Sequence, residues 1–248
     1  MTESARTSSP QDFSITLKNV SVVIPVGPHD NAWKELIEDL INLPLKTEIL
    51  FVGSHFAPES VSLISETLAL GRSVRWITAK QGRAEQMNAG AEKATGDFVW
   101  FLHSDSRFTL QTLMGLEVSL QKNPDLIHYF KLRFSGTSPL TRLNDLGVLI
   151  RSRYFKMPFG DQGLCMKKSV FRELGDFPLG TAYGEDHLLI WNAHQRGIAL
   201  SEIQACLLTS PRKYEKGGWL KTTSRHLWLT YKQAAPELVK LLKKQSPR

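Results

Sequence analysis

Short apolar runs alternate with amphipathic segments in the N-terminal part of the chain, and this alternation limits the fold more than any other feature. The runs are rich in β-branched and aromatic residues and contain few polar positions, which is typical of strands buried on both faces of a parallel sheet. Repeated strand–helix units predict an α/β fold: an open, mostly parallel, doubly wound sheet with helices on both faces and ligands at the carboxyl ends of the strands. The predicted strands are 20–26, 48–52, 74–78 and 98–102, and the helices between them are 31–43, 61–70 and 84–94.

The C-terminal half is less regular but contains the same kinds of element. No repeat or low-complexity linker divides the chain. We therefore predict a disordered tail at 1–16, one folded domain at 17–218 and a basic amphipathic helical segment at 219–248. In the second half of the domain we predict helices at 110–121, 139–153 and 185–196 and strands at 126–134, 163–166 and 198–207.

The charge balance favours anionic partners. Lysine and arginine number 31 against 24 acidic residues, which gives a net charge of +7. This sign attracts nucleotide phosphates, acidic lipid headgroups or nucleic acid. The sequence has no zinc-finger spacing, RNP-like motif or basic–aromatic array, so we predict no nucleic-acid partner. No GxGxxG follows the first strand, which disfavours a nicotinamide-dependent oxidoreductase.

Three sequence features predict the cellular location. The 2 cysteines are too few for a disulfide framework, and the N-terminus has no apolar leader of the secretory kind. No uncharged apolar run approaches the roughly 18 residues that a bilayer span needs. We predict a cytoplasmic protein, either soluble or attached peripherally to the inner face of the membrane.

The strand predicted at 98–102 leads directly into His103, Ser104 and Asp105. An imidazole and a carboxylate therefore stand at the ligand-binding edge of the predicted sheet. Mg²⁺ or Mn²⁺ bound to a diphosphate needs a few hard oxygen ligands, and Mn²⁺ also accepts imidazole. A strand end at which Asp105 caps the next segment would explain the same residues.

A glycine and an arginine open the helix predicted at 84–94. Gly82 permits a tight turn, and Arg83 brings a guanidinium to a helix N-terminus, an arrangement that suits a diphosphate. Asn88 lies about one turn further along the helix. The alternative is an ordinary helix whose Gly90 packs closely against the sheet.

Two adjacent carboxylates, Glu185 and Asp186, open the helix predicted at 185–196. A carboxylate at this place can serve as a general base that deprotonates an acceptor hydroxyl. Acidic residues also favour helix starts because of the macrodipole, so a structural role explains them too.

Two loops carry further polar residues. Segment 159–163 is a turn that contains Asp161 and Gln162, and segment 210–218 is a basic, glycine-ended loop that could close over phosphates. Each loop fits plain turn chemistry as well as a catalytic role.

Taken in order, four segments resemble glycosyltransferase family 2, the inverting enzymes of GT-A fold. The resemblance is greatest to a small bacterial subgroup often found beside radical-SAM and selenium-related genes. It covers about 20–218, and four motifs in one order are specific where one would be weak. The matching segments are 82–106 (GRAEQMNAGAEKATGDFVWFLHSDS), 159–178, 184–189 (GEDHLL) and 210–218.

The resemblance implies a metal-dependent, inverting transfer of a sugar from a nucleotide-diphosphate sugar to an acceptor hydroxyl. Asp186 falls at the position of the catalytic base, with Glu185 beside it. Asp105 and His103 fall at the metal site, where His103 takes the first acidic place of the family's DXD signature. The other implied contacts are Gly82, Arg83, Asn88, Arg212 and Lys213 for the donor, and Asp161 and Gln162 for the sugar or acceptor.

The sequence also departs from the family's pattern. After the second strand the family usually carries an acidic residue that holds the base or ribose, as in VVDDGS, but Gly53 and Ser54 stand there. The loop after the first strand also differs, with Asp30 as a partial replacement. The alternative function is therefore a catalytically inactive nucleotide-sugar-binding or scaffold protein on the same fold.

The C-terminal segment combines apolar and basic residues. We predict that Pro236 divides it into two helices, because proline lacks an N–H group and clashes with the preceding turn. Its apolar residues either dock on the domain or contact a membrane, with basic residues facing anionic lipid. A membrane contact would suit a lipid-linked acceptor.

Overall fold

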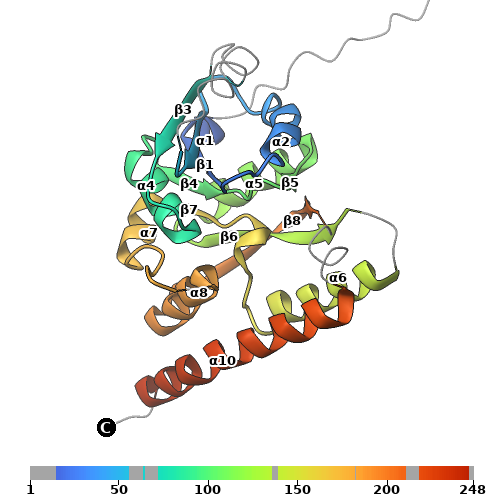
Figure 1. Cartoon of the computed structure of the whole chain (residues 1–248). Helices are drawn as coiled ribbons and strands as arrows, with labels where there is room; N and C mark the ends of the chain where they lie inside the picture. Colours follow the sequence, from blue (N-terminus) through green and yellow to red (C-terminus); the bar gives the residue numbers. More distant parts are fainter. Residues whose placement is uncertain are drawn as a thin grey trace, which may run out of the picture.

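The computed structural model describes residues 15–55, 64, 72–135, 139–181, 183–210 and 218–245. These residues form one sheet with helices on both faces, and a long C-terminal helix lies along one side of the molecule (Figure 1). The strands are β1 (Val20–Val26), β2 (Glu48–Gly53), β3 (Ser73–Thr78), β4 (Phe98–Phe101), β5 (Ser106–Arg107), β6 (Ile127–Phe134), β7 (Cys165–Lys167) and β8 (Leu200–Thr209). The helices are α1 (Ile15–Lys18), α2 (Trp33–Leu40), α4 (Arg83–Lys93), α5 (Leu110–Lys122), α6 (Pro139–Tyr154), α7 (Lys168–Glu173), α8 (Glu185–Arg196) and α10 (Trp219–Gln245), with a 3₁₀ turn, η1, at Gly160–Gln162.

The four N-terminal strands are parallel, as predicted. β1 pairs with β2 on one side and with β4 on the other, and β2 pairs with β3. Their bounds agree with the predicted ones within one residue. The predicted helix at 61–70 lies outside the described residues apart from Ile64. The helix predicted at 31–43 is shorter in the structure: α2 runs only from Trp33 to Leu40.

The second half of the sheet is mixed. The strand order is β3-β2-β1-β4-β7-β6-β8-β5, with β7 antiparallel to both β4 and β6, and β6 parallel to β8. The predicted α/β fold with an open, mostly parallel sheet is confirmed. The short elements α1, β5 and α7 were not predicted, because two to six residues show no usable period. α1 begins at Ile15, inside the tail predicted as disordered.

Alternate residues of β1 face two separate hydrophobic layers. Val22 and Ile24 pack with residues of α2 and α5 on one face, whereas Val23 packs with residues of α4 and α8 on the other. All three side chains are fully buried. Because both faces are covered, the carboxyl ends of the parallel strands remain the natural place for a ligand.

Helix α4 packs closely on β1 and β2 through Gly90. A Cβ atom at this position would lie 2.3 Å from Cγ1 of Val23 and 3.0 Å from Cγ2 of Val52. We expect Gly90→Ala to destabilise the protein by about 1–2 kcal/mol, because overpacking a buried site outweighs the gain in helix propensity. Gly147→Ala in α6 is the control: among the described residues, no atom outside the adjoining turns of its own helix lies within 4 Å of a Cβ there, so it should stabilise the protein by about 0.5–1 kcal/mol. Urea unfolding of both variants measures the difference, and equal effects would contradict the packing argument.

A buried glutamate ties β1, β2, β3 and the end of α4 together. Glu48 accepts hydrogen bonds from Ser21 Oγ (2.6 Å) and the backbone N–H of Thr95 (2.8 Å), and it forms an ion pair with Arg75. Burial alone would raise the pKa of Glu48, but the bonds from Ser21, Thr95 and Arg75 outweigh it and hold the pKa below its usual value. The carboxylate therefore stabilises the fold above its unfolded pKa of about 4.3, and this contribution is lost as the pH falls through the folded value.

We expect Glu48→Gln to lower the free energy of unfolding at pH 7 by about 1–2 kcal/mol, the size of a charged hydrogen bond beside a partly exposed arginine. The difference from the parent should shrink as the pH falls below about 4, where the parent also loses the charge. Denaturant unfolding at several pH values tests this. A difference that stays constant down to the lowest pH would contradict the ionised state.

The C-terminal segment is one helix, so the prediction that Pro236 divides it is wrong. α10 runs from Trp219 to Gln245 with Pro236 inside it. Residues on both sides of the proline bond to α8: Gln233 to His187 (3.0 Å) and Glu237 to Gln195 (2.8 Å). This shared support offsets the hydrogen bond that the proline cannot donate. Within the described residues, no helix has both the length and the apolar character needed to cross a bilayer.

Candidate active site

The predicted site residues come from segments far apart in the sequence that meet beyond the carboxyl ends of β1 and β4. The start of α4 supplies Arg83, the turn after β4 supplies His103, and η1 supplies Asp161. Helix α8 begins with Glu185 and Asp186. The contacts described below bring these five residues into one cluster.

Asp186 is a buried carboxylate with its charge stabilised by backbone groups. Its Oδ2 accepts the N–H of Gly160 (2.5 Å) and its Oδ1 accepts the N–H of His187 (2.9 Å). Burial would raise the pKa of Asp186, but the charge of Arg83, these two bonds and the nearby His103 together lower it. Asp186 is therefore ionised at neutral pH, in the state in which a carboxylate can accept a proton.

Arg83 is the cation that balances the two acidic residues. Its Nε donates to Glu185, and its Nη2 lies 4.0 Å from Asp186 Oδ1. Burial would lower the pKa of Arg83, but Asp186, Glu185 and Asp161 raise it above its usual value. The side chain is 38% exposed, so Arg83 remains partly accessible to solvent, and a guanidinium is a favourable partner for an anionic ligand.

Gly160 lies between His103 and Asp186 and has room for no side chain. A Cβ atom there would lie 2.9 Å from Asp186 Oδ2 and 3.1 Å from His103 Nε2. Gly160 was not singled out from the sequence, because it acts through its backbone N–H group, which bonds to Asp186. Asp105 follows His103 in a turn that closes with a bond from the Ser106 N–H to the His103 carbonyl (3.1 Å).

Helix α10 supports the loop that precedes Asp186. Gln233 Nε2 donates to the carbonyl of Tyr183 (2.8 Å), and Gln233 Oε1 lies 3.0 Å from His187 Nδ1. Trp191 donates to His187 Nε2 (2.9 Å), so Nδ1 carries the proton and donates to Gln233. Gly184 has a positive φ of 72°, and a Cβ there would meet Gln233 at 2.2 Å. Gln233 was not singled out in the sequence, because nothing in a helical pattern marks a contact 46 residues away.

The loop after β1 is joined to the loop that carries His103 and Asp105. Asp30 accepts a hydrogen bond from Ser104 Oγ (2.5 Å) through one oxygen and from the N–H of Ala32 (3.0 Å) through the other. Asp30, predicted as a partial replacement for the family's usual pattern in this loop, thus joins the loops that follow β1 and β4.

Two predicted contact residues use their side chains to hold the fold. Asn88 donates to the carbonyl of Phe177 (2.8 Å) and accepts its N–H (3.0 Å). Gln162 is buried; it donates to the carbonyl of Phe130 (2.9 Å) and accepts from Ser152 Oγ (2.8 Å). Both amides therefore anchor loops around the cluster. Gly82 has a φ of 141° and directly precedes α4 as its N-cap. The predicted donor contacts Arg212 and Lys213 lie outside the described residues.

The ring of Trp76 fills the space next to Gly53, where the family usually carries an acidic residue. Gly53 lies at the end of β2, and a Cβ atom there would lie 2.3 Å from the ring of Trp76 in β3. An aspartate at this position would require Trp76 to move. The indole of Trp76 thus occupies the space beside β2 that an acidic side chain would need.

A divalent metal has only partial support from the residues described. Among them, no three His, Cys, Asp or Glu side chains form a group that would hold a metal ion. His103 and Asp105 offer two donors on one turn, with His103 Nε2 facing the carboxylate cluster. Two protein donors fit a Mg²⁺ or Mn²⁺ ion that also binds a substrate diphosphate, rather than an ion held by protein alone.

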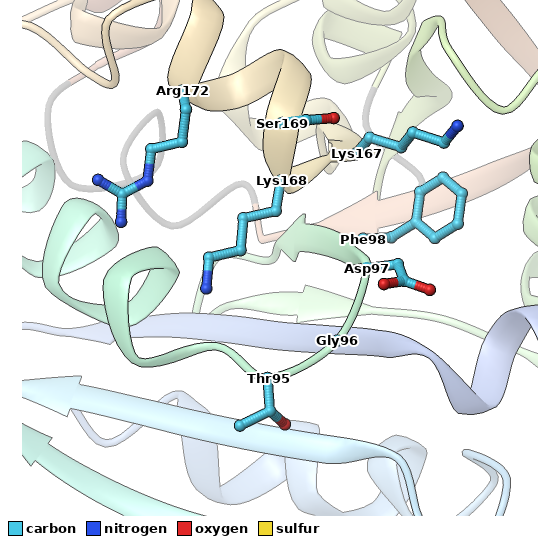
Figure 2. A pocket seen from close by; sticks show the side chains of 8 residues that line it. All are labelled: Thr95, Gly96, Asp97, Phe98, Lys167, Lys168, Ser169 and Arg172. Carbon is cyan, nitrogen blue, oxygen red and sulfur yellow. The ribbon is translucent and has the colours of Figure 1, made fainter.

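The hollow drawn in Figure 2 is a different place. It lies at the amino end of β4 and the start of α7, at the edge of the sheet opposite the cluster. Four of its residues are charged, but they include only one carboxylate. It is lined by Thr95, Gly96, Asp97, Phe98, Lys167, Lys168, Ser169 and Arg172. We therefore place the candidate site at the cluster beyond the carboxyl ends of the strands and not in this hollow.

Comparison with solved structures places the fold among glycosyltransferases. The mannosyltransferase PcManGT from Pyrobaculum calidifontis, in complex with GDP-Man and Mn²⁺, matches with a TM-score of 0.65 and 19% identity over 92% of this chain and 68% of that one. A 1–349 fragment of S. aureus TarS in complex with UDP-GlcNAc matches with a TM-score of 0.58 and 16% identity, over 77% and 58%. GalNAc-T7 with UDP, GalNAc and Mn²⁺ matches with a TM-score of 0.58 and 15% identity, over 77% and 43%.

These likenesses show the GT-A fold, and the chain spans only about half the length of the latter two proteins. No protein with a curated description matches the sequence. The sequence profile of Glycosyl transferase family 2 matches residues 21–175, which run from the second residue of β1 to the end of α7 and include three of the five clustered residues, Arg83, His103 and Asp161. The chain therefore belongs to glycosyl transferase family 2.

Proposed function

We propose that the protein transfers a sugar from a nucleotide-diphosphate sugar to an acceptor hydroxyl, with inversion at the anomeric carbon. The observation that carries this proposal is Asp186: a buried, ionised carboxylate beside Arg83 and His103 at the carboxyl ends of the parallel strands. Membership of a glycosyltransferase family and the nucleotide sugars bound to its structural neighbours support it.

In this proposal Asp186 accepts the proton of the acceptor hydroxyl. The hydroxyl oxygen attacks the anomeric carbon as the bond to the departing diphosphate breaks, so one displacement inverts the configuration. The bonds from Gly160 and His187 fix the carboxylate in one orientation. Glu185 holds Arg83, whose positive charge would stabilise the negative charge that grows on the leaving group. Asp161 lies close enough to affect Arg83 and would border the sugar or the acceptor.

A divalent metal fits this site as a partner of the donor. Asp105 and His103 would hold Mn²⁺ or Mg²⁺, and the ion would offset charge on the diphosphate. Mn²⁺ is present in two of the neighbouring structures, which supports this assignment. Arg212 and Lys213, in the basic segment predicted as a loop at 210–218, would add positive charge on the same ligand.

We assign the chain to the bacterial subgroup whose motifs it resembles, and to the cytoplasm or the inner face of the membrane. A catalytically inactive, nucleotide-sugar-binding protein is the second candidate. The observation that favours it is Gly53. Trp76 leaves no space at this position for the acidic side chain that usually holds the nucleotide in this family. The two candidates share donor binding and differ in turnover.

Calorimetric titration with a panel of UDP and GDP sugars, with and without Mn²⁺, tests the shared part. We expect one donor to bind, more tightly with Mn²⁺. Asp105→Ala should lower the Mn²⁺-dependent affinity by about tenfold or more, because it removes one of two protein ligands next to the diphosphate. Asp125→Ala, whose side chain pairs only with Lys167 among the contacts described, is the matched control. If Asp105→Ala binds donor and metal like the parent, the metal assignment is wrong.

A further inference from the structure

Helices α6 and α10 each expose a row of large apolar side chains. The two helices lie together at one side of the molecule (Figure 1), joined where Trp219 Nε1 donates to the Leu140 carbonyl and to Asn144 Oδ1, both at 3.1 Å. We call the exposed apolar residues of both helices the α6–α10 face. It comprises Leu140, Leu143, Leu146, Leu149, Ile150 and Tyr154 of α6 and Leu220, Leu227, Trp228, Tyr231, Leu238, Val239 and Leu242 of α10.

The apolar row of α10 points away from the protein. Leu220, Leu227, Tyr231, Leu238 and Leu242 recur at intervals of seven and four residues, so they share one side of the helix. Residues on the other side, such as Gln233 and Glu237, bond to α8. Trp228 and Tyr231 are 62% and 67% exposed, so the row is not the edge of the core.

The apolar row of α6 is placed in the same way. Leu143, Leu146, Ile150 and Tyr154 follow the three- and four-residue spacing of one helix side and are exposed. Ser152, on the opposite side, is buried and bonds to Gln162. Both helices therefore turn an apolar side to the outside, and an apolar surface of this kind marks a contact with another apolar phase.

Charge identifies the partner. α10 carries Lys221, Arg225, Lys232, Lys240 and Lys243 in its described part, against one acidic residue, Glu237, which already bonds to Gln195 and Lys240. A second copy of the same face would bring like charges together and be repelled. An anionic lipid surface attracts these residues, and the aromatic pair Trp228–Tyr231, with ring centroids 6.4 Å apart, suits the bilayer interface.

We propose that the α6–α10 face docks on an anionic lipid bilayer, with α10 lying in the plane of the interface. Its apolar row enters the boundary between headgroups and acyl chains, and its basic residues contact acidic headgroups. The inward side of α10 contacts Tyr183 and Gly184 beside Asp186, so docking brings the candidate site near the membrane. Vesicle binding does not require sugar transfer, and the two proposals can fail separately; if both hold, the acceptor is a membrane-anchored hydroxyl.

Co-sedimentation of the full chain with two kinds of vesicle tests the proposal. We expect binding to vesicles of equal parts phosphatidylcholine and phosphatidylglycerol at low salt, and much weaker binding to phosphatidylcholine alone or at high salt. Arg225→Gln/Lys232→Gln should weaken binding by about tenfold to thirtyfold, since each basic residue near the surface contributes about fivefold. Trp228→Ser/Tyr231→Ser should weaken vesicle binding by about tenfold or more, because the apolar area of the two aromatic rings no longer enters the interface.

Two double variants on other surfaces serve as controls. Met114→Ser/Val118→Ser removes exposed apolar residues of α5, and Lys34→Gln/Lys122→Gln removes two exposed lysines elsewhere; both should bind like the parent. Failure of the parent to bind anionic vesicles at low salt would overturn the proposal, as would equal binding by the α10 variants and the controls. A dimer in light scattering that Trp228→Ser/Tyr231→Ser makes monomeric would assign the face to self-association instead.

Discussion

Replacing Asp186 by asparagine is expected to lower the rate of sugar transfer by about 10² to 10⁴, the usual loss when a general base is removed. The amide has nearly the same shape but cannot accept a proton at neutral pH. The affinity for the donor should change little, because Arg83 keeps its bond to Glu185. The rate of nucleoside diphosphate release in the presence of acceptor, measured for parent and variant, gives the ratio.

The same change should also affect stability, which has to be measured in parallel. Both carboxylate oxygens of Asp186 accept a backbone N–H, and an amide can accept only one of them. The other N–H then faces an NH₂ group, at a cost of about 1–3 kcal/mol. Asp125→Asn on the surface is the matched control for rate and stability. Near-normal transfer by a folded Asp186→Asn variant would move the role of the base to another carboxylate.

Replacing Arg83 by methionine is expected to destabilise the protein by about 2–4 kcal/mol at pH 7. The change keeps much of the side-chain volume but leaves the buried carboxylates of Glu185 and Asp186 without their cation. Breaking a buried pair costs about 3–5 kcal/mol, and the partial exposure of Arg83 reduces this figure. Denaturant unfolding measures the loss, and a change below about 0.5 kcal/mol would contradict this account of the ion pairs.

Two further variants separate charge from packing. Arg83→Lys keeps the cation and should lose less stability than Arg83→Met. Arg83→Met/Glu185→Gln removes one of the uncompensated charges, so it should be more stable than Arg83→Met alone. If the double variant is instead less stable, the cost of Arg83→Met comes from lost packing and not from the buried carboxylates.

The central fold was predictable because its signal is local. The four parallel strands, β1 to β4, are short apolar runs. Gly82 precedes α4 and Gly197 follows α8. Both signals can be recognised in the sequence without knowledge of distant contacts. The strand predicted at 163–166 corresponds to β7, but its antiparallel direction depends on pairing with distant residues and could not be predicted from three residues. The two-residue edge strand β5 was missed for the same reason. The helix break expected at Pro236 failed because contacts with α8 on both sides outweigh the local preference.

The site was predictable in part for the same reason. Glu185 and Asp186 stand at a recognisable helix start, and Arg83 and His103 lie in motifs beside strands and helices. Asn88 shows the limit of such reasoning: its amide binds the backbone of Phe177, 89 residues away. A polar side chain in a motif does not reveal whether it faces a ligand or anchors a loop.

The supporting residues lay beyond sequence reasoning altogether. Gly160 acts through its backbone N–H, and Gln233 acts from a helix nearly fifty residues further along the chain. Neither has a side-chain type or spacing that marks a catalytic site. Only the packing of η1 and α10 against α8 brings them to Asp186.

Single-turnover release of nucleoside diphosphate from a bound nucleotide sugar tests the central claim most directly. The purified protein, loaded with the donor that calorimetry identifies and with Mn²⁺, should cleave the bond between sugar and diphosphate, and an acceptor hydroxyl should speed the reaction. The Asp186→Asn variant should bind the same donor and cleave it more slowly. Tight donor binding by a folded parent protein with no cleavage, with or without acceptor, would contradict an enzymatic function and favour a nucleotide-sugar-binding protein.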